Sequence, residues 1–316
     1  MKIINNTTEF YIEEETAVAI GKFDGFHRGH QKLLRMIQEQ KANGLATVVF
    51  TFVPSPTAFF SKEVLRDLTT VEEKRRIFEA AGVDYLIEYP FYQETADMEP
   101  ETYIKEVLVD KLHAKCIIAG DDLSYGKRGA GDDKLLKEKA LEYGYDVIII
   151  EKVLYEGREV SSTYVRDEVK QGNMELVHNL LGMPYHVGGK IIHGRKLGRT
   201  IGMPTVNLEP PEEKLLPPKG VYYSYVVLQG KQYPAISNIG TKPTVDANKV
   251  MGVETFIYDF DDEVYGEELE VYLLSFKRPE MKFDSVQSLK TQMANDIEDG
   301  KNYHSYVNKC CQYGQC

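Results

Sequence analysis

The sequence predicts two domains, an α/β domain with a parallel sheet followed by a small antiparallel β-barrel with a closing helix. Over residues 17–153, apolar segments rich in β-branched residues alternate with amphipathic helices, as in a parallel sheet covered on both faces. Beyond residue 185, short alternating strands are separated by glycine and proline turns, the spacing of a small barrel. A length of 316 residues accommodates two domains, which we expect at 1–184 and 185–316.

The first domain should contain strands and helices in alternation. The expected strands are 18–20, 46–52, 85–87, 115–119 and 147–150. The expected helices are 30–42, 71–81, 100–112 and 134–143, followed by 164–170 and 174–181. Thr70 and Glu73 have capping-box spacing at the start of one helix, and Gly144 ends another. Ligands of such sheets bind beyond the carboxyl ends of the strands, so we expect a site after the first strand.

The second domain should be a barrel with one helix. The expected strands are 186–192, 220–228, 232–238, 252–259 and 269–276. The closing helix is expected over 285–299, with Leu289, Met293 and Ile297 on one stripe.

Composition restricts the class of function. A formal net charge of −11 argues against nucleic acids or anionic membranes as general binding partners of the protein surface. Residues 1–15 are polar and do not resemble a signal peptide, and no apolar run is long enough to span a bilayer. We expect Cys116 to be buried, and Cys310, Cys311 and Cys316 to be free thiols in a reducing cytoplasm.

A phosphate site is expected at residues 19–30. Gly21, Gly25 and Gly29 allow a turn after the first strand, and a helix begins directly after that turn. His27 and His30 add side-chain donors at the same place. The alternative is a turn that carries two solvated histidines.

Two further segments suit anions. The hydroxyls of Ser161, Ser162 and Thr163 precede Arg166 at a helix start, where they form either an anion clasp or a simple N-cap. The loop at 194–207 is rich in glycine and basic residues, but it is not a Walker loop. Its phosphate-binding candidates are Gly194, Lys196, Gly198, Arg199 and Gly202. The alternative is a basic hairpin loop without a ligand.

These motifs resemble one known family. Gly21-x-Phe-Asp-Gly-x-His-x-Gly-His30 resembles the signature of nucleotidyltransferases with a His-x-Gly-His loop. Residues 194–207 resemble the riboflavin kinase pattern Gly-x-x-Leu-Gly-x-x-x-Gly-x-Pro-Thr-Ala-Asn, with Val206 in place of alanine. Over nearly its whole length the chain is similar to the bacterial bifunctional riboflavin kinase/FMN adenylyltransferase (FAD synthetase) family. The resemblance implies a Rossmann-like nucleotidyltransferase domain, an ATP- and Mg²⁺-dependent kinase domain, and riboflavin, FMN and ATP as small-molecule substrates.

The resemblance also implies roles in the first domain. His27 and His30 would contact ATP phosphates. The phosphate-binding loop would include Gly21, Phe23, Asp24 and Gly25, with Asp24 either orienting the loop, joining a Mg²⁺ network or capping the turn. Asp122 and Tyr125 would lie beside the flavin. The family's Pro-His-Pro reads Pro54-Ser55-Pro56 here, so a serine stands where a histidine is expected.

In the second domain, the resemblance assigns Thr205 and Asn207 to Mg²⁺–ATP and Glu254 to the catalytic base. By alternation Glu254 and Phe256 share a face, which we expect to point into the barrel mouth and to raise the pKa of Glu254. The alternative is a surface glutamate. Arg278 would contact the flavin ring, or form a surface salt bridge. The loop at Pro243 and Thr244 would lie beside the site.

Three functions remain open at this point. The leading hypothesis is an enzyme that makes FMN and then FAD. The second is a riboflavin kinase whose first domain is degenerate, which Ser55 suggests. The third is a flavin-binding regulator without turnover, against which the intact set of Thr205, Asn207 and Glu254 argues. We expect a monomer.

Overall fold

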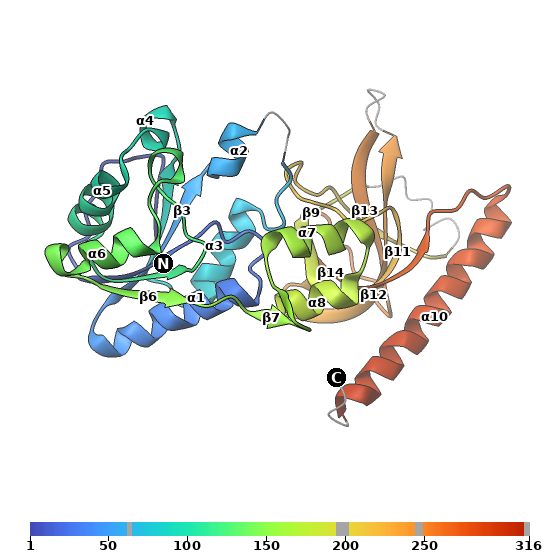
Figure 1. Ribbon diagram of the computed structural model, residues 1–316. Coiled ribbons are helices and arrows are strands. Elements are labelled where there is room, and N and C mark those ends of the chain that lie inside the picture. The colour runs from blue at the N-terminus through green and yellow to red at the C-terminus, as the bar shows by residue number, and fades with distance from the viewer. Residues whose placement is uncertain (62–64, 194–201, 244–248, 313–316) are drawn as a thin grey trace. The chain divides into compact units, whose positions relative to one another are not determined.

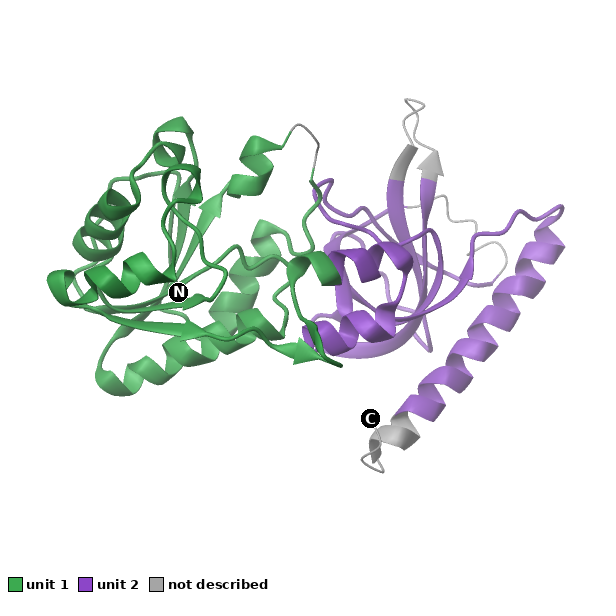
Figure 2. Ribbon diagram, in the orientation of Figure 1, with its two compact units in different colours: residues 1–164 green, residues 165–316 purple. Residues whose placement is uncertain are grey.

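The computed structural model describes residues 1–61, 65–193, 202–243 and 249–312, and the chain folds into two units (Figure 2). The N-terminal unit is Met1–Tyr164 and the C-terminal unit is Val165–Cys316. The division falls within helix α7 (Ser162–Gln171).

The N-terminal unit is built on a six-stranded sheet with strand order β1-β4-β3-β2-β5-β6, in which every pair is parallel. Its strands are β1 (Lys2–Asn5), β2 (Thr16–Ile20), β3 (Ala46–Val53), β4 (Tyr85–Pro90), β5 (Ala114–Gly120) and β6 (Asp146–Ile150). The predicted parallel sheet is confirmed. Strand β1 was not predicted, because its four residues are mostly exposed and lack an apolar pattern.

Helices cover both faces of this sheet (Figure 1). The burial of strand β2 explains why both faces need to be covered. Its odd residues, such as Ala17, share a core with α1 (Arg28–Glu39) and α3 (Val71–Ala80). Its even residues, such as Val18, share the other core with the π-helical segment η2 (Tyr103–Lys111) and α6 (Asp133–Tyr143). Residues 17–20 are apolar on both faces of β2 because the strand is buried on both sides. The shorter elements are α2 (Pro56–Phe60), α4 (Gln93–Ala96), α5 (Pro100–Thr102), η1 (Gln40–Asn43), η3 (Lys127–Gly129), β7 (Leu154–Tyr155) and β8 (Arg158–Glu159).

The C-terminal unit contains a closed antiparallel barrel with strand order β10-β13-β12-β11-β14-β9. Its strands are β9 (Tyr185–Ile192), β10 (Val206–Leu208), β11 (Gly220–Leu228), β12 (Lys231–Pro243), β13 (Lys249–Ile257) and β14 (Glu268–Pro279). The predicted barrel is confirmed. The short strand β10 was not predicted, although it carries Asn207.

The inside of the barrel is marked by a chain of hydroxyls. Ser237 Oγ lies 2.8 Å from both Ser224 Oγ and Thr255 Oγ1, and all three residues are almost fully buried. The alternate residues of these strands therefore face outward.

Helices flank the barrel. Helix α8 (Met174–Leu181) packs on β14 and β9 and buries most of its apolar residues. Helix α10 (Val286–Gln312) packs on β12 and is longer than the predicted 285–299. Ile297 of the predicted stripe contacts an outer-face cluster formed by Val221, Ile236 and Tyr258 with Tyr223 and Phe256.

Candidate active sites

The turn after β2 places His27 at the start of α1. His27 is the N-cap residue, and its Nδ1 accepts a hydrogen bond from the Gly29 amide at 3.2 Å. A Cβ at Gly29 would lie only 3.0 Å from the His27 ring, so any larger residue here would crowd that ring. Because Nδ1 is an acceptor, the neutral ring carries its proton on Nε2, where it is available as a donor.

The two motif histidines form one stack. Their ring centroids lie 3.8 Å apart at an interplanar angle of 20°, and Phe23 packs on His30 with a centroid separation of 5.1 Å. Burial lowers the pKa of His27 to about 4, against the carboxylates of Asp24 and Asp122, which raise it. Burial, with His27 and Lys74 adding to the effect, holds the pKa of His30 well below its ordinary value. Both rings are therefore neutral at pH 7, and the buried Nδ1 of His30 has no hydrogen-bond partner among the described residues.

Asp24 holds the turn against the segment at 68–69. Its Oδ1 accepts hydrogen bonds from the amides of Leu68, at 2.8 Å, and Thr69, at 3.2 Å. The Gly25 amide in turn donates to Thr69 Oγ1 at 2.9 Å. With φ at +87° and Leu68 2.8 Å from its hypothetical Cβ, Gly25 occupies a position that only glycine fills without strain. Of the three roles considered for Asp24, these contacts favour orientation of the loop.

The hydroxyl motif is bonded to the same turn. Ser162 Oγ donates to the backbone oxygen of Asp24 at 2.7 Å, although the two residues are far apart in sequence. Ser161 Oγ accepts from the Tyr164 amide at 3.2 Å, as an N-cap does. Thr163 is exposed. Arg166 belongs to the C-terminal unit, so its predicted place beside the histidines stays a prediction.

The two residues predicted to bind flavin in this unit differ in exposure. Asp122 is exposed and lies 3.8 Å from the ammonium of Lys152. Tyr125 is buried, its ring lies against Tyr103 at 5.3 Å, and its hydroxyl donates to the Asp132 carbonyl at 3.3 Å. The structure gives Tyr125 a packing role, and its contact with flavin stays a prediction.

An aromatic group that the sequence analysis missed lies beyond the end of β3. Phe52, Phe59 and Phe60 surround Phe91, with centroid separations between 5.2 and 5.9 Å. Phe60 is 65% exposed, which is unusual for a phenylalanine that takes part in a cluster. The pair Phe59-Phe60, four and five residues after Ser55, was the available sequence signal.

In the C-terminal unit, three oxygen-bearing side chains lie close together where β10 pairs with β13. Thr205 Oγ1 donates to Glu254 Oε1 at 2.6 Å. Asn207 is two residues further on, lies directly opposite Glu254 in the antiparallel pair, and is buried. Asn207 and Glu254 share one face of the sheet because they lie directly opposite each other, and the hydrogen bond holds Thr205, just before β10, beside Glu254.

That side is the outer face of the barrel, which corrects the expectation that Glu254 points into the mouth. Thr255 faces inward with the other buried hydroxyls, so its neighbours Glu254 and Phe256 face outward. The predicted sharing of a face by Glu254 and Phe256 is confirmed, and Phe256 packs in the cluster beside α10. Gly202, with φ at +78°, precedes this cluster. Gly194, Lys196, Gly198, Arg199 and Thr244 lie outside the described residues.

Arg278 forms an ion pair with the closing helix. Its NH2 group lies 2.5 Å from Asp296 Oδ2, and its Nε lies 3.1 Å from both carboxylate oxygens. Asp296 is buried, which differs from the surface salt bridge considered as the alternative for Arg278. Gln292 donates to the same carboxylate at 3.0 Å. The arginine therefore fastens α10 to β14, and its contact with flavin stays a prediction.

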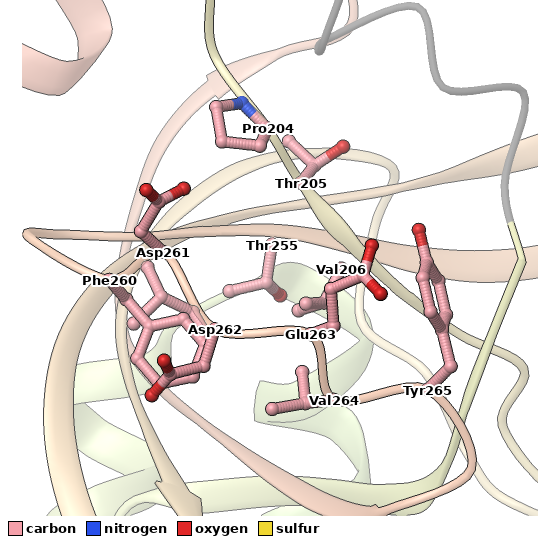
Figure 3. Close-up of a pocket in the computed structure, with 11 residues that line it drawn as sticks. Pro204, Thr205, Val206, Thr255, Phe260, Asp261, Asp262, Glu263, Val264 and Tyr265 are labelled. Atoms are coloured by element: carbon pink, nitrogen blue, oxygen red, sulfur yellow. The ribbon is translucent and has the colours of Figure 1, made fainter.

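A cavity of about 310 Å³ opens beside Thr205 (Figure 3). Thr205 lies on one side of the cavity, and the loop that carries Asp261, Asp262 and Glu263 lies on the other. Thr255 and Ile257 of β13 contribute buried side chains. Asp261 and Asp262 were not among the predicted site residues, because turn residues and cavity-lining residues have the same composition.

Comparisons with known proteins assign the two units. Residues 10–164 match the family model for FAD synthetase, and residues 181–304 match the model for riboflavin kinase. The bifunctional riboflavin kinase/FMN adenylyltransferase of Escherichia coli K12 is 37% identical over 287 residues, covering 90% of this chain and 91% of that protein. The protein of the same name from Bacillus subtilis is 34% identical over 320 residues, covering 98% and 100%.

One solved structure is similar over most of the chain. A crystal structure described as a macrolide-efflux protein from Streptococcus pneumoniae superposes with a TM-score of 0.83 at 31% identity, covering 95% of this chain and 98% of that one. Within the described ranges of this chain, no helix has the length and apolar character needed to cross a membrane. The identity to the curated relatives, over nearly their full length and in both units, settles the family. The chain belongs to the bifunctional riboflavin kinase/FMN adenylyltransferase family.

Proposed function

We propose that the cluster of Thr205, Asn207 and Glu254 is the centre at which riboflavin is phosphorylated. The observation that carries this proposal is the 2.6 Å hydrogen bond from Thr205 to Glu254, opposite the buried Asn207. Glu254 removes the proton of the flavin's 5′-hydroxyl, and that oxygen bonds to the γ-phosphorus of ATP. The bond from the γ-phosphorus to the β–γ bridging oxygen breaks, and ADP leaves.

The same cluster suits Mg²⁺. A hydroxyl, an amide and a carboxylate offer oxygen ligands, which a hard cation prefers, and Mg²⁺ keeps several waters when few protein ligands are present. Thr205 and Asn207 are the residues that would hold the ion with ATP. When bound, Mg²⁺ offsets the charge of the ATP phosphates.

The cavity beside Thr205 suits the nucleoside end of ATP. Its carboxylates, on Asp261, Asp262 and Glu263, repel phosphates but accept hydrogen bonds from ribose hydroxyls or an amino group. A volume of about 310 Å³ is within the range of small-molecule sites. Of the three cluster residues only Thr205 lines this cavity, so the phosphates would lie toward Thr205.

Adenylyl transfer is assigned to the N-terminal unit. An FMN phosphate oxygen bonds to the α-phosphorus of ATP, the bond to the α–β bridging oxygen breaks, and pyrophosphate leaves. Neutral His27 donates from Nε2 to the phosphate chain, and the aromatic group around Phe60 offers an exposed surface for the flavin ring. The chain acts as a monomer in the cytoplasm.

Product analysis tests these assignments together. Full-length protein is incubated with riboflavin, ATP and Mg²⁺, and FMN and FAD are separated by chromatography. We expect both products from the wild type, and FMN without FAD from His30→Ala. A wild type that makes FMN and never FAD would support the alternative of a kinase with a degenerate first unit, which Ser55 favours. Loss of FMN formation in His30→Ala would contradict separate sites.

A further inference from the structure

The two motif histidines bring no positive charge to the N-terminal site. Both motif histidines are buried and neutral, so they offer hydrogen bonds without charge. Ser55 occupies the position after β3 where a histidine is expected. Its hydroxyl caps α2 by accepting a hydrogen bond from the Ala58 amide at 3.2 Å. Bringing a triphosphate and the FMN phosphate together in such a site calls for a cation.

Lys22 supplies a cation at this place. It follows Gly21 directly after β2, and β2 pairs with β3, whose end leads to Ser55. Lys22 Nζ donates to Thr57 Oγ1 at 2.7 Å, in the first turn of α2 and two residues beyond Ser55. The ammonium therefore lies at the same carboxyl edge of the sheet as the His27 turn, beside the segment that carries the serine.

Nothing in the fold requires this lysine. Its side chain is exposed, its partner Thr57 is exposed and uncharged, and among the residues that the structure describes Lys22 forms no ion pair. A single exposed hydrogen bond of this kind contributes little to stability. The ammonium is free to move from the hydroxyl to an anion.

We propose that Lys22 binds a phosphate of the adenylyl-transfer reactants and stands in for the histidine that is replaced by Ser55. The position is the variable residue of the Gly21-x-Phe-Asp motif, to which the motif assigns no role. The proposal rests on adenylyl transfer by the N-terminal unit, so FAD formation by the wild type is established first.

The test measures kcat/KM for FAD formation from FMN and ATP in full-length Lys22→Met, Lys22→Arg, Ser55→His and the double variant Lys22→Met/Ser55→His. FMN formation by the same chains is the internal control, and thermal unfolding checks the fold. Lys41→Met is the control for loss of a lysine away from the site, because Lys41 lies near the opposite ends of the strands, where it donates to the Gly82 carbonyl at 2.8 Å and pairs with Asp84 at 3.1 Å.

We expect Lys22→Met to lower kcat/KM for FAD at least about tenfold, with FMN formation and the unfolding temperature unchanged. Lys22→Arg should retain most activity, and Lys41→Met should match the wild type. Ser55→His should restore activity to Lys22→Met, and more so at pH 6 than at pH 8, because a histidine gains charge as the pH falls through about 6.5. A structural role would not produce that pH-dependent rescue. Wild-type kcat/KM in Lys22→Met, or a loss that neither Lys22→Arg nor Ser55→His relieves, would overturn the proposal.

Discussion

At the scale of single residues, Glu254 carries the most specific expectation. Glu254→Gln keeps the size of the side chain and its ability to accept from Thr205, but it removes the base. We expect kcat for FMN formation to fall about 10²- to 10⁴-fold with little change in KM for riboflavin, because a base acts on the transition state. Steady-state kinetics with riboflavin as the varied substrate measure both parameters.

The control for this variant is Glu267→Gln, which removes the charge of an exposed glutamate in the same unit. It should leave both parameters unchanged. If Glu254→Gln turned over riboflavin like the wild type, the base would have to be another group.

The buried histidines make stability depend on pH. The folded pKa of His27 is about 4 and its ordinary value 6.5, so between these values the unfolded chain binds a proton that the folded chain does not. The stability due to neutral His27 is complete above pH 6.5 and is lost as the pH falls toward 4, by at most about 1.4 kcal/mol per pH unit. Urea unfolding followed by circular dichroism between pH 7 and pH 5 measures the effect.

His27→Asn isolates this contribution, because asparagine still caps a helix but does not titrate. Its free energy of unfolding should fall less steeply with decreasing pH than that of the wild type. Equal slopes for the two proteins would show that the pKa of His27 in the folded chain is close to its ordinary value.

Sequence motifs located these residues but not the side on which they lie. Alternation places Glu254 and Phe256 together, yet β13 carries apolar side chains on both sides, Val253 and Ile257 inward and Phe256 outward. Which side faces the interior is decided by barrel closure and by α10, and neither is encoded in the alternation of one strand. For the same reason, the pairing of Arg278 with the buried Asp296 could not be predicted from the sequence.

At the scale of elements, α10 depends on that partner. In Asp296→Asn the guanidinium of Arg278 remains largely buried without its counter-charge, which costs on the order of 3 kcal/mol. Asp299→Asn removes an exposed partner of Lys277 and should cost less than about 1 kcal/mol. Urea unfolding of the two variants gives the comparison. Equal, small losses would mean that the pair with Arg278 does not hold the helix.

Elements were predictable where a repeat was long enough to recognise. The parallel strands and their helices follow from runs of apolar residues, and the capping box at Thr70 and Glu73 forms as expected. Strand β10 has only three residues, too few to show a period of two, and it is held by pairing with β9 and β13. Non-local pairing of this kind has no local signature.

At the scale of the whole molecule, the limits of the kinase unit can be tested with fragments. The predicted domain begins at residue 185, whereas the C-terminal unit of the structure begins at Val165 and includes α8. Helix α8 packs on β9 and β14 and buries Met174, Val177, Leu180 and Leu181. Burial of such side chains contributes roughly 1.5–3 kcal/mol each, so removing the helix deprives the barrel of substantial stabilisation and exposes its apolar surface.

We therefore expect fragment 165–316 to be soluble and to convert riboflavin to FMN, since Thr205, Asn207 and Glu254 all lie within it. Fragment 183–316 contains the same three residues but lacks α8, so it should unfold at a lower temperature and aggregate more readily. Differential scanning calorimetry and an FMN assay on both fragments separate stability from chemistry. Equal stability would place the boundary after α8, at the predicted position. If fragment 165–316 folded but made no FMN while the full chain did, the kinase site would require the N-terminal unit, and the two activities would not be independent.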